Sequence, residues 1–185
     1  MQQVNNTSAE YDAVINLCKG LFMKKTHDYG TAWRILRPTS ITDQIFIIAQ
    51  RIRTLEEKQV SKVDEDVTSE YIGIINYCVI AMMQLECNED TPLELSSEQV
   101  NEWYDNKAGE TKELMFAKNH DYGEAWRDMR ISSLTDLILM KRLRVKQIED
   151  NKGLTEASEG VKANYQDMLN YAVFALIKLG VHLSK

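Results

Sequence analysis

The stretch HDYGTAWRILR at residues 27–37 returns almost unchanged as HDYGEAWRDMR at residues 120–130. Eight of the eleven positions are identical, and His27 and His120 stand 93 residues apart. The same separation holds on both sides of the motif, and it becomes 94 after one inserted residue. The matched pairs include Tyr11 and Tyr104, Thr42 and Thr135, Arg51 and Arg144, Glu56 and Glu149, and Asn76 and Asn170. Similarity in register over nearly half the chain indicates a tandem duplication.

The seam between the two copies lies in ECNEDTPLELSSEQ at residues 86–99. This segment is acidic and polar, and it contains Pro92, a residue that interrupts helices. We therefore expect a first repeat at residues 1–92 and a second repeat at residues 93–185.

Apolar residues in each copy recur with the spacing of helices that bury one face. We expect three helices per repeat, at residues 11–22, 41–55 and 67–85 and at residues 100–118, 134–150 and 161–183. Ser8, and Ser96 with Gln99, are expected N-caps, and Ser40 with Asp43 resembles a capping box. Each half has a small core, so the sequence predicts an all-α fold in which two three-helix units pack as a pseudo-symmetric bundle, like a fused dimer.

The composition supports helices and narrows the classes of partner. Two prolines and eight glycines are few for a turn-rich β fold. A net charge of −6 argues against general nucleic-acid binding, and no apolar run is long enough to cross a membrane. The start of the sequence lacks a secretory signal pattern, and the three unclustered cysteines are typical of reduced thiols. We therefore expect a cytoplasmic protein.

The two copies differ at a position on their second helix. Lys141 replaces Ile48 on a face that otherwise seeks the core, and Arg144 lies one turn further along the same side. Burial of an ammonium group is costly unless it is paired or faces a polar cleft. Two cations at this spacing suit a phosphate or a partner carboxylate, and Lys141 and Arg144, with Arg51 in the first repeat, are candidate phosphate-binding residues. Alternatively, Lys141 extends its ammonium group to solvent.

The last helix carries the complementary change. Asp167 replaces Gly73, and Glu159 lies about two turns earlier, with Asn170 next along roughly the same stripe. Carboxylates at this spacing can bind Mg²⁺ and meet a polyphosphate held by the facing cations. Glu159 and Asp167 are therefore candidate metal ligands, and the second repeat is the candidate site-bearing one.

The repeated motif itself supplies further candidates. In each copy a histidine precedes an aspartate, as His27-Asp28 and His120-Asp121. A ligand or phosphate role and a loop-fixing hydrogen bond are both open for these histidines, and we take His120 and Asp121 as the candidate catalytic pair. Trp126 is either a core anchor or a platform on which a base stacks.

These residues resemble a known family. The second repeat has KNHDYGEAW at residues 118–126, then Lys141 with Arg144, then Glu159, then DMLNYA at residues 167–172. This pattern is similar to the nucleotide modification associated domain family, first type, in a two-copy form like that of the Bacteroides group. The first repeat matches through HDYGTAW, Arg51, Glu65 and the Asn-Tyr pair, and it departs at Ile48 and Gly73.

The family looks distantly similar to the all-α nucleotide pyrophosphohydrolases of the MazG and dimeric dUTPase type. That resemblance implies helix-borne E-x-x-E and E-x-x-D carboxylates that bind Mg²⁺. This chain has Asn164 in place of the glutamate that would precede Asp167, and neither half has an intact E-x-x-E. Two functions therefore stay open: a Mg²⁺-dependent nucleotide hydrolase, or a non-catalytic nucleotide-sensing or protein-interaction module. The expected partner is a small-molecule nucleotide, and a homodimer is possible.

Overall fold

The structure is a computed structural model, and it describes residues 6–58, 66–157 and 159–183. Each copy of the HDYG motif ends a long helix at a sharp corner. Helix α1 (Thr7–Tyr29) ends at Gly30, and α4 (Ser97–Tyr122) ends at Gly123. The φ angles of these glycines are 60° and 63°, a region that other residues rarely adopt. The corner therefore requires the glycine of the motif in both copies.

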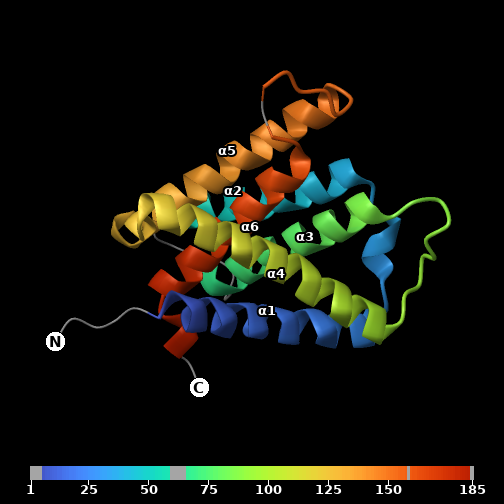
Figure 1. The fold of residues 1–185 in the computed structure, drawn as a ribbon, viewed down its shortest axis with the longest axis horizontal. Coiled ribbons are helices and arrows are strands. Elements are labelled where there is room, and N and C mark those ends of the chain that lie inside the picture. The colour runs from blue at the N-terminus through green and yellow to red at the C-terminus, as the bar shows by residue number, and fades with distance from the viewer. Residues whose placement is uncertain (1–5, 59–65, 158, 184–185) are drawn as a thin grey trace.

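Each corner is followed by the same succession of elements. The first repeat continues with η1 (Ala32–Ile35), α2 (Pro38–Lys58) and α3 (Val67–Glu86). The second continues with η2 (Ala125–Asp128), α5 (Ile131–Asp150), α6 (Val161–Lys178) and η3 (Val181–Leu183). The predicted all-α fold and the duplication of a three-helix unit are confirmed (Figure 1). The boundary predicted at Pro92 falls in the segment between α3 and α4.

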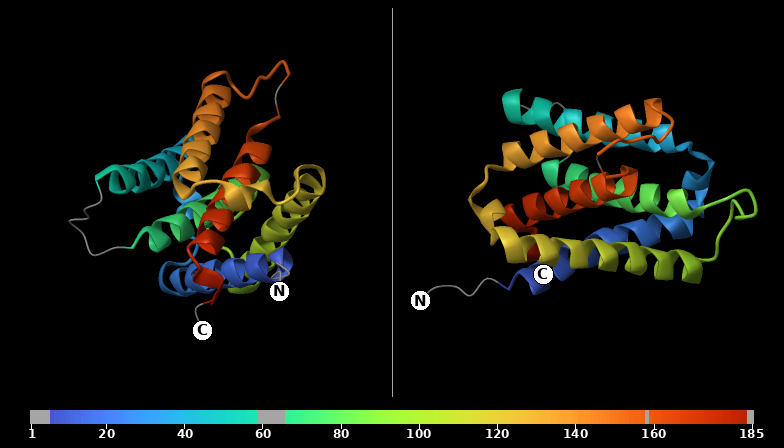
Figure 2. Two further views of the ribbon diagram at one scale, coloured as in Figure 1. Left: turned by 90° about the vertical axis from the view of Figure 1, so that its left-hand side faces the viewer. Right: turned by 45° about the horizontal axis from the view of Figure 1, so that its top comes forward.

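The six helices form three layers, and each layer pairs one helix with its counterpart from the other repeat (Figure 2). Helices α2 and α5 form one outer layer, α3 and α6 the middle layer, and α1 and α4 the other outer layer. The two middle helices are the most apolar and bury most of their side chains. The two repeats thus share one hydrophobic core.

Buried polar pairs join the repeats symmetrically. The Tyr11 hydroxyl donates a hydrogen bond to Asn170 Oδ1 at 2.8 Å, and the Tyr104 hydroxyl donates to Asn76 Oδ1 at 2.8 Å. The amide nitrogen of Asn170 also donates to the carbonyl of Thr111 at 3.3 Å. Asn170 therefore belongs to the interface between the repeats.

A second symmetric set lies between α2 and α5. The Thr42 hydroxyl donates to Glu149 Oε1 at 2.8 Å, and the Thr135 hydroxyl donates to Glu56 Oε1 at 3.0 Å. Burial raises the pKa of both glutamates above the ordinary value, although the threonine hydrogen bonds oppose the shift. These contacts hold α2 of the first repeat against α5 of the second repeat.

The predicted helix starts have mixed outcomes. Ser96 and Gln99 form the expected capping box at the start of α4. Ser8 lies inside α1, whose N-cap is Asn6, so that prediction was wrong. The capping box at Ser40 was also wrong, because α2 already begins at Pro38, a residue favoured in the first turn. None of the described helices is long and apolar enough to span a membrane.

Candidate anion-binding site

Lys141 and Asp167 meet as the comparison of the repeats predicted. Lys141 Nζ on α5 lies 2.6 Å from Asp167 Oδ2 on α6. The Asp167 side chain is only 4% exposed, and that of Lys141 is 12% exposed. Sequence reasoning missed a third member: Lys118 Nζ on α4 lies 2.5 Å from Asp167 Oδ1. Three helices of the second repeat thus converge on one carboxylate.

The cluster of Lys118, Lys141 and Asp167 carries two cations and one anion. Burial lowers the pKa of Lys118, but its hydrogen bond to Asp167 and the charge of Asp167 raise it more. The charges of Tyr171 and Glu159 add to this increase, and the net pKa lies above the ordinary value. Lys118 therefore stays charged at neutral pH, and the cluster keeps an excess positive charge.

A pocket of about 560 Å³ lies beside this cluster, between the end of α5, the following loop and the start of α6. Lys141, Arg144, Glu159 and Asn164 line it. Arg144 is exposed and forms no ion pair within the described ranges. The amide nitrogen of Asn164 donates to the carbonyl of Gly160 at 3.0 Å, which fixes the side chain at the wall. The pocket therefore presents one constrained cation and one solvent-facing cation.

The predicted Mg²⁺ ligands, Glu159 and Asp167, have different surroundings in the structure. Asp167 Oδ1 accepts a hydrogen bond from Lys118, Asp167 Oδ2 forms an ion pair with Lys141, and Glu159 is exposed on the loop. Among the described residues, no three His, Cys, Asp or Glu side chains are placed to hold a metal ion. Mg²⁺ favours several oxygen ligands with no competing cations. The residues in this place therefore do not fit Mg²⁺, and we assign no step to it.

The candidate catalytic pair lies in the last turn of α4, outside the residues that line the pocket. The side chains of His120 and Asp121 are 88% and 73% exposed, and His120 Nδ1 lies 3.2 Å from Asp121 Oδ1. His27 and Asp28 show the same local contact at 3.5 Å. The structure therefore brings neither pair to the pocket, and the catalytic role of His120 and Asp121 stays a prediction.

Two other predicted site residues have structural partners. Trp126 is buried and stacks on Phe174, with ring centroids 4.2 Å apart and planes inclined by 5°. Arg51 forms an ion pair with the buried Glu70 of its own repeat. Glu65, which the family pattern includes, lies outside the described residues.

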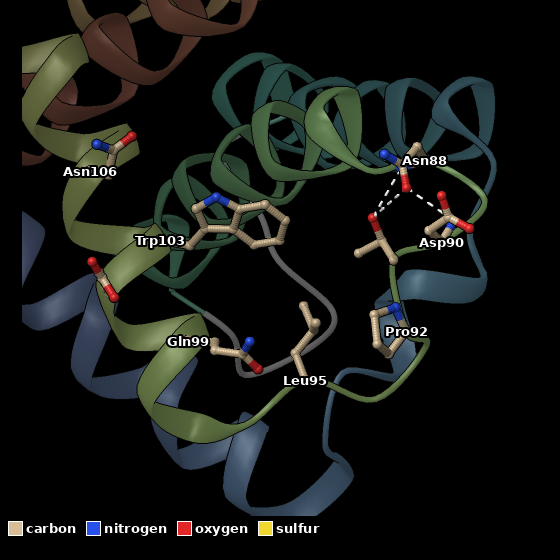
Figure 3. Close-up of a pocket in the computed structure, with 9 residues that line it drawn as sticks. Asn88, Asp90, Pro92, Leu95, Gln99, Trp103 and Asn106 are labelled. Atoms are coloured by element: carbon tan, nitrogen blue, oxygen red, sulfur yellow. Dashed lines mark hydrogen bonds between the residues drawn. The ribbon is translucent and has the colours of Figure 1, made fainter.

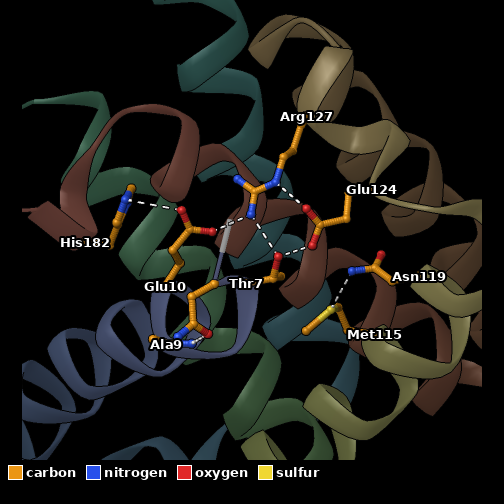
Figure 4. A network of polar contacts seen from close by, with 9 residues as sticks. Thr7, Ala9, Glu10, Met115, Asn119, Glu124, Arg127 and His182 are labelled. Carbon is orange, nitrogen blue, oxygen red and sulfur yellow. Dashed lines mark hydrogen bonds and ion pairs between the residues drawn. The ribbon is translucent and has the colours of Figure 1, made fainter. Parts of the chain in front are cut away.

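The arginine of HDYG-x-A-W-R has a role that sequence reasoning missed. Arg127 binds Glu124 at 2.6 Å, the Thr7 hydroxyl at 2.8 Å, and Glu10 (Figure 4). His182, which has no counterpart in the first repeat, lies 3.5 Å from Glu10 in the same network. Arg127 thus ties the corner after α4 to the start of α1.

Arg34 does the corresponding work in the first repeat. It donates to Gln84 Oε1 at 2.6 Å and to the carbonyls of Thr91 and Pro92 at 3.0 and 3.3 Å. These bonds tie the corner after α1 to the segment that leads into α4. The same arginine occurs in both copies of the motif, and this repetition was the sequence signal from which its role could have been predicted.

A separate pocket of about 550 Å³ lies at the segment between the repeats (Figure 3). Trp103, Asn88 and Asn106 line it, and its charged lining residues are Asp90 and Glu102. No cation is among the described residues that line it and its carboxylates repel phosphate, so this pocket does not suit the expected ligand.

The model of nucleotide modification associated domain 1 matches residues 25–85 and 118–179, one match in each repeat. No curated protein and no solved structure matches the chain at a significant level. The more distant likeness to the MazG and dimeric dUTPase enzymes has no match behind it and stays a prediction.

Proposed function

The chain belongs to the nucleotide modification associated domain 1 family, and we propose that it binds a nucleotide through its phosphates at the basic pocket of the second repeat. The observation that carries the proposal is the placement of Lys141 and Arg144 along one wall of that pocket. Lys141 is already paired with Asp167, but Asp167 is not among the residues that line the pocket.

The two cations suit different parts of phosphate binding. Asp167 holds the Lys141 ammonium group in place, so little conformational freedom is lost when an anion binds. Arg144 presents a planar guanidinium group that can donate two parallel hydrogen bonds to phosphate oxygens. Glu159 is the acidic residue that lines the pocket, and its carboxylate can accept from a sugar hydroxyl or an amino group.

We propose binding without hydrolysis. Cleavage of a phosphoanhydride needs stabilisation of developing charge and activation of a water molecule, usually by metal ions. Asp167 is already paired with two lysines, and the residues that line the pocket include a single carboxylate. This arrangement supports a nucleotide-sensing protein, the alternative that the sequence left open.

Calorimetric titration of the full chain with nucleoside triphosphates, monophosphates and unphosphorylated nucleosides tests the proposal. We expect phosphate-dependent binding that weakens with salt. Arg144→Ala, which leaves the Asp167 cluster intact, should weaken it about tenfold to a hundredfold, the usual range for a charge-assisted hydrogen bond.

The matched control is Lys146→Ala, on the same helix, where Lys146 is paired with Asp150 outside the pocket. Its affinity should equal that of the unaltered chain. Equal losses in both variants would reduce the effect to net charge and refute a specific site. Release of pyrophosphate in the presence of Mg²⁺, abolished by Asp167→Asn, would show instead that the protein is a hydrolase.

A further inference from the structure

A different pocket, of about 540 Å³, lies in the first repeat between α1, η1 and α3. Trp33, Tyr29 and Tyr77 line it together with Phe22 and aliphatic side chains. Lys25 is the cation that lines it, and Glu70, which is paired with Arg51, is the carboxylate. A concave, mostly apolar space with a few polar groups is typical of a small-molecule site. Its volume falls in the range of such sites, roughly 300–1,000 Å³.

In the second repeat, an aromatic side chain of the chain itself occupies the corresponding place. Trp126 corresponds to Trp33, and Phe174 corresponds to Ile80. The Phe174 ring stacks on Trp126, whereas Trp33 is only partly buried and makes no ring contact with any described residue. The first repeat therefore keeps the tryptophan and lacks the aromatic ring that covers it.

The first repeat also lacks the negative charge that Asp167 provides in the second repeat. Lys118, the counterpart of Lys25, binds Asp167, but the position of Asp167 is Gly73 in the first repeat. Lys25 is exposed and has no ion-pair partner in the part of the chain that the structure describes. The first repeat therefore keeps the lysine and lacks an anion at the position of Asp167.

We propose that the first repeat binds a planar aromatic ligand that carries an anionic group, with the ring against Trp33 and the anion at Lys25. The ligand supplies both groups that the second repeat supplies from its own chain. Positions 73 and 80 are seven residues apart on α3, or about 10 Å along a helix. A spacer between ring and anion therefore fits better than a directly attached carboxylate. Phosphates and carboxylates share the required chemistry.

Titration of the full chain with three probes distinguishes a phosphate ligand from a carboxylate ligand. The probes are a nucleoside 5′-monophosphate, the corresponding nucleoside, and indole-3-butyrate. We expect saturable binding of at least one anionic probe. Gly73→Asp supplies the missing anion, and a Cβ there would meet no atom closer than Ile48 Cδ1 at 3.4 Å. This variant should weaken binding at least tenfold without loss of thermal stability.

Two further variants test the ring and the cation separately. Ile80→Phe should abolish binding because its ring takes the ligand's place against Trp33. Lys25→Ala should weaken the anionic probes at least tenfold and leave the nucleoside unchanged, whereas Lys24→Ala, on the same helix, should change neither.

The site is independent of the pocket in the second repeat, so Arg144→Ala should leave its affinity unchanged. If only the proposed phosphate binding in the second repeat fails, Gly73→Asp should still weaken binding to the first repeat. An absence of saturable binding for all three probes, or binding that is indifferent to Gly73→Asp, would overturn the inference. Loss of binding in Arg144→Ala but not in Gly73→Asp would also overturn it, because the ligand would then occupy the second repeat.

Discussion

The hydroxyl of Tyr11 in the first repeat and the amide oxygen of Asn170 in the second are hydrogen-bonded at 2.8 Å inside the shared core. The same contact recurs at the same distance between Tyr104 and Asn76. Each hydroxyl therefore satisfies a buried amide of the other repeat. Burial raises the pKa of Tyr11 and Tyr104 far above the ordinary tyrosine value, so both hydroxyls stay protonated as donors.

Removal of one of these hydroxyls should lower the free energy of unfolding, because a buried amide oxygen then loses its hydrogen-bond donor. Tyr11→Phe leaves Asn170 Oδ1 without its donor, which typically costs about 1–3 kcal/mol. Tyr104→Phe should cost a similar amount because its partner Asn76 is buried in the same way. Urea unfolding measures both losses. Tyr122→Phe in the exposed corner is the control, and a loss in that variant as large as in Tyr11→Phe would contradict the prediction.

The stability of the protein should also depend on the protonation of Glu149. Burial raises its folded pKa above the unfolded value, so the folded state binds the proton more tightly. The resulting stabilisation is fully present below the unfolded pKa, about 4.3, and is lost as the pH rises through the higher folded pKa. Glu149→Gln, which is neutral throughout, should therefore gain in melting temperature over the unaltered chain as the pH increases from 4 to 7.

Thermal melts at both pH values test this sign. The exposed Glu156→Gln should show no such pH-dependent gain. A gain for Glu149→Gln that is larger at pH 4 than at pH 7 would show the opposite linkage and refute the prediction.

The fold and part of the site could be predicted because both follow from the alignment of the chain with itself. Periodicity located the helices, and the differences between repeats singled out Lys141 and Asp167, which do meet. A search for differences cannot detect residues that are the same in both copies, which is why Lys118 and Arg127 were missed. The directions of side chains at a helix end also do not follow from spacing, and His120 and Asp121 point to solvent.

Asp167 should be needed for stability because two lysines depend on it. Asp167→Ala leaves Lys141 close to the core without a counter-charge, and the loss of one partner of a buried pair typically costs about 3–5 kcal/mol. The first repeat suggests the compensation, since it has Ile48 in place of the lysine. The double variant Asp167→Ala with Lys141→Ile should therefore recover a large part of the loss. Urea unfolding of the two single variants and the double variant measures this coupling, and simple additivity would contradict it.

Arg127 should determine how firmly the start of α1 is attached. Arg127→Ala removes the contacts to Glu10, Glu124 and the Thr7 hydroxyl at once. The two glutamates then lose their ion pairs with this arginine. We expect faster amide hydrogen exchange in the first two turns of α1, with a global destabilisation of about 2 kcal/mol. Arg130→Ala is the matched control, because this arginine ends the same motif but is exposed and forms no ion pair in the described ranges. Unchanged exchange in Arg127→Ala, or equal acceleration in both variants, would show that the network in Figure 4 does not anchor the helix.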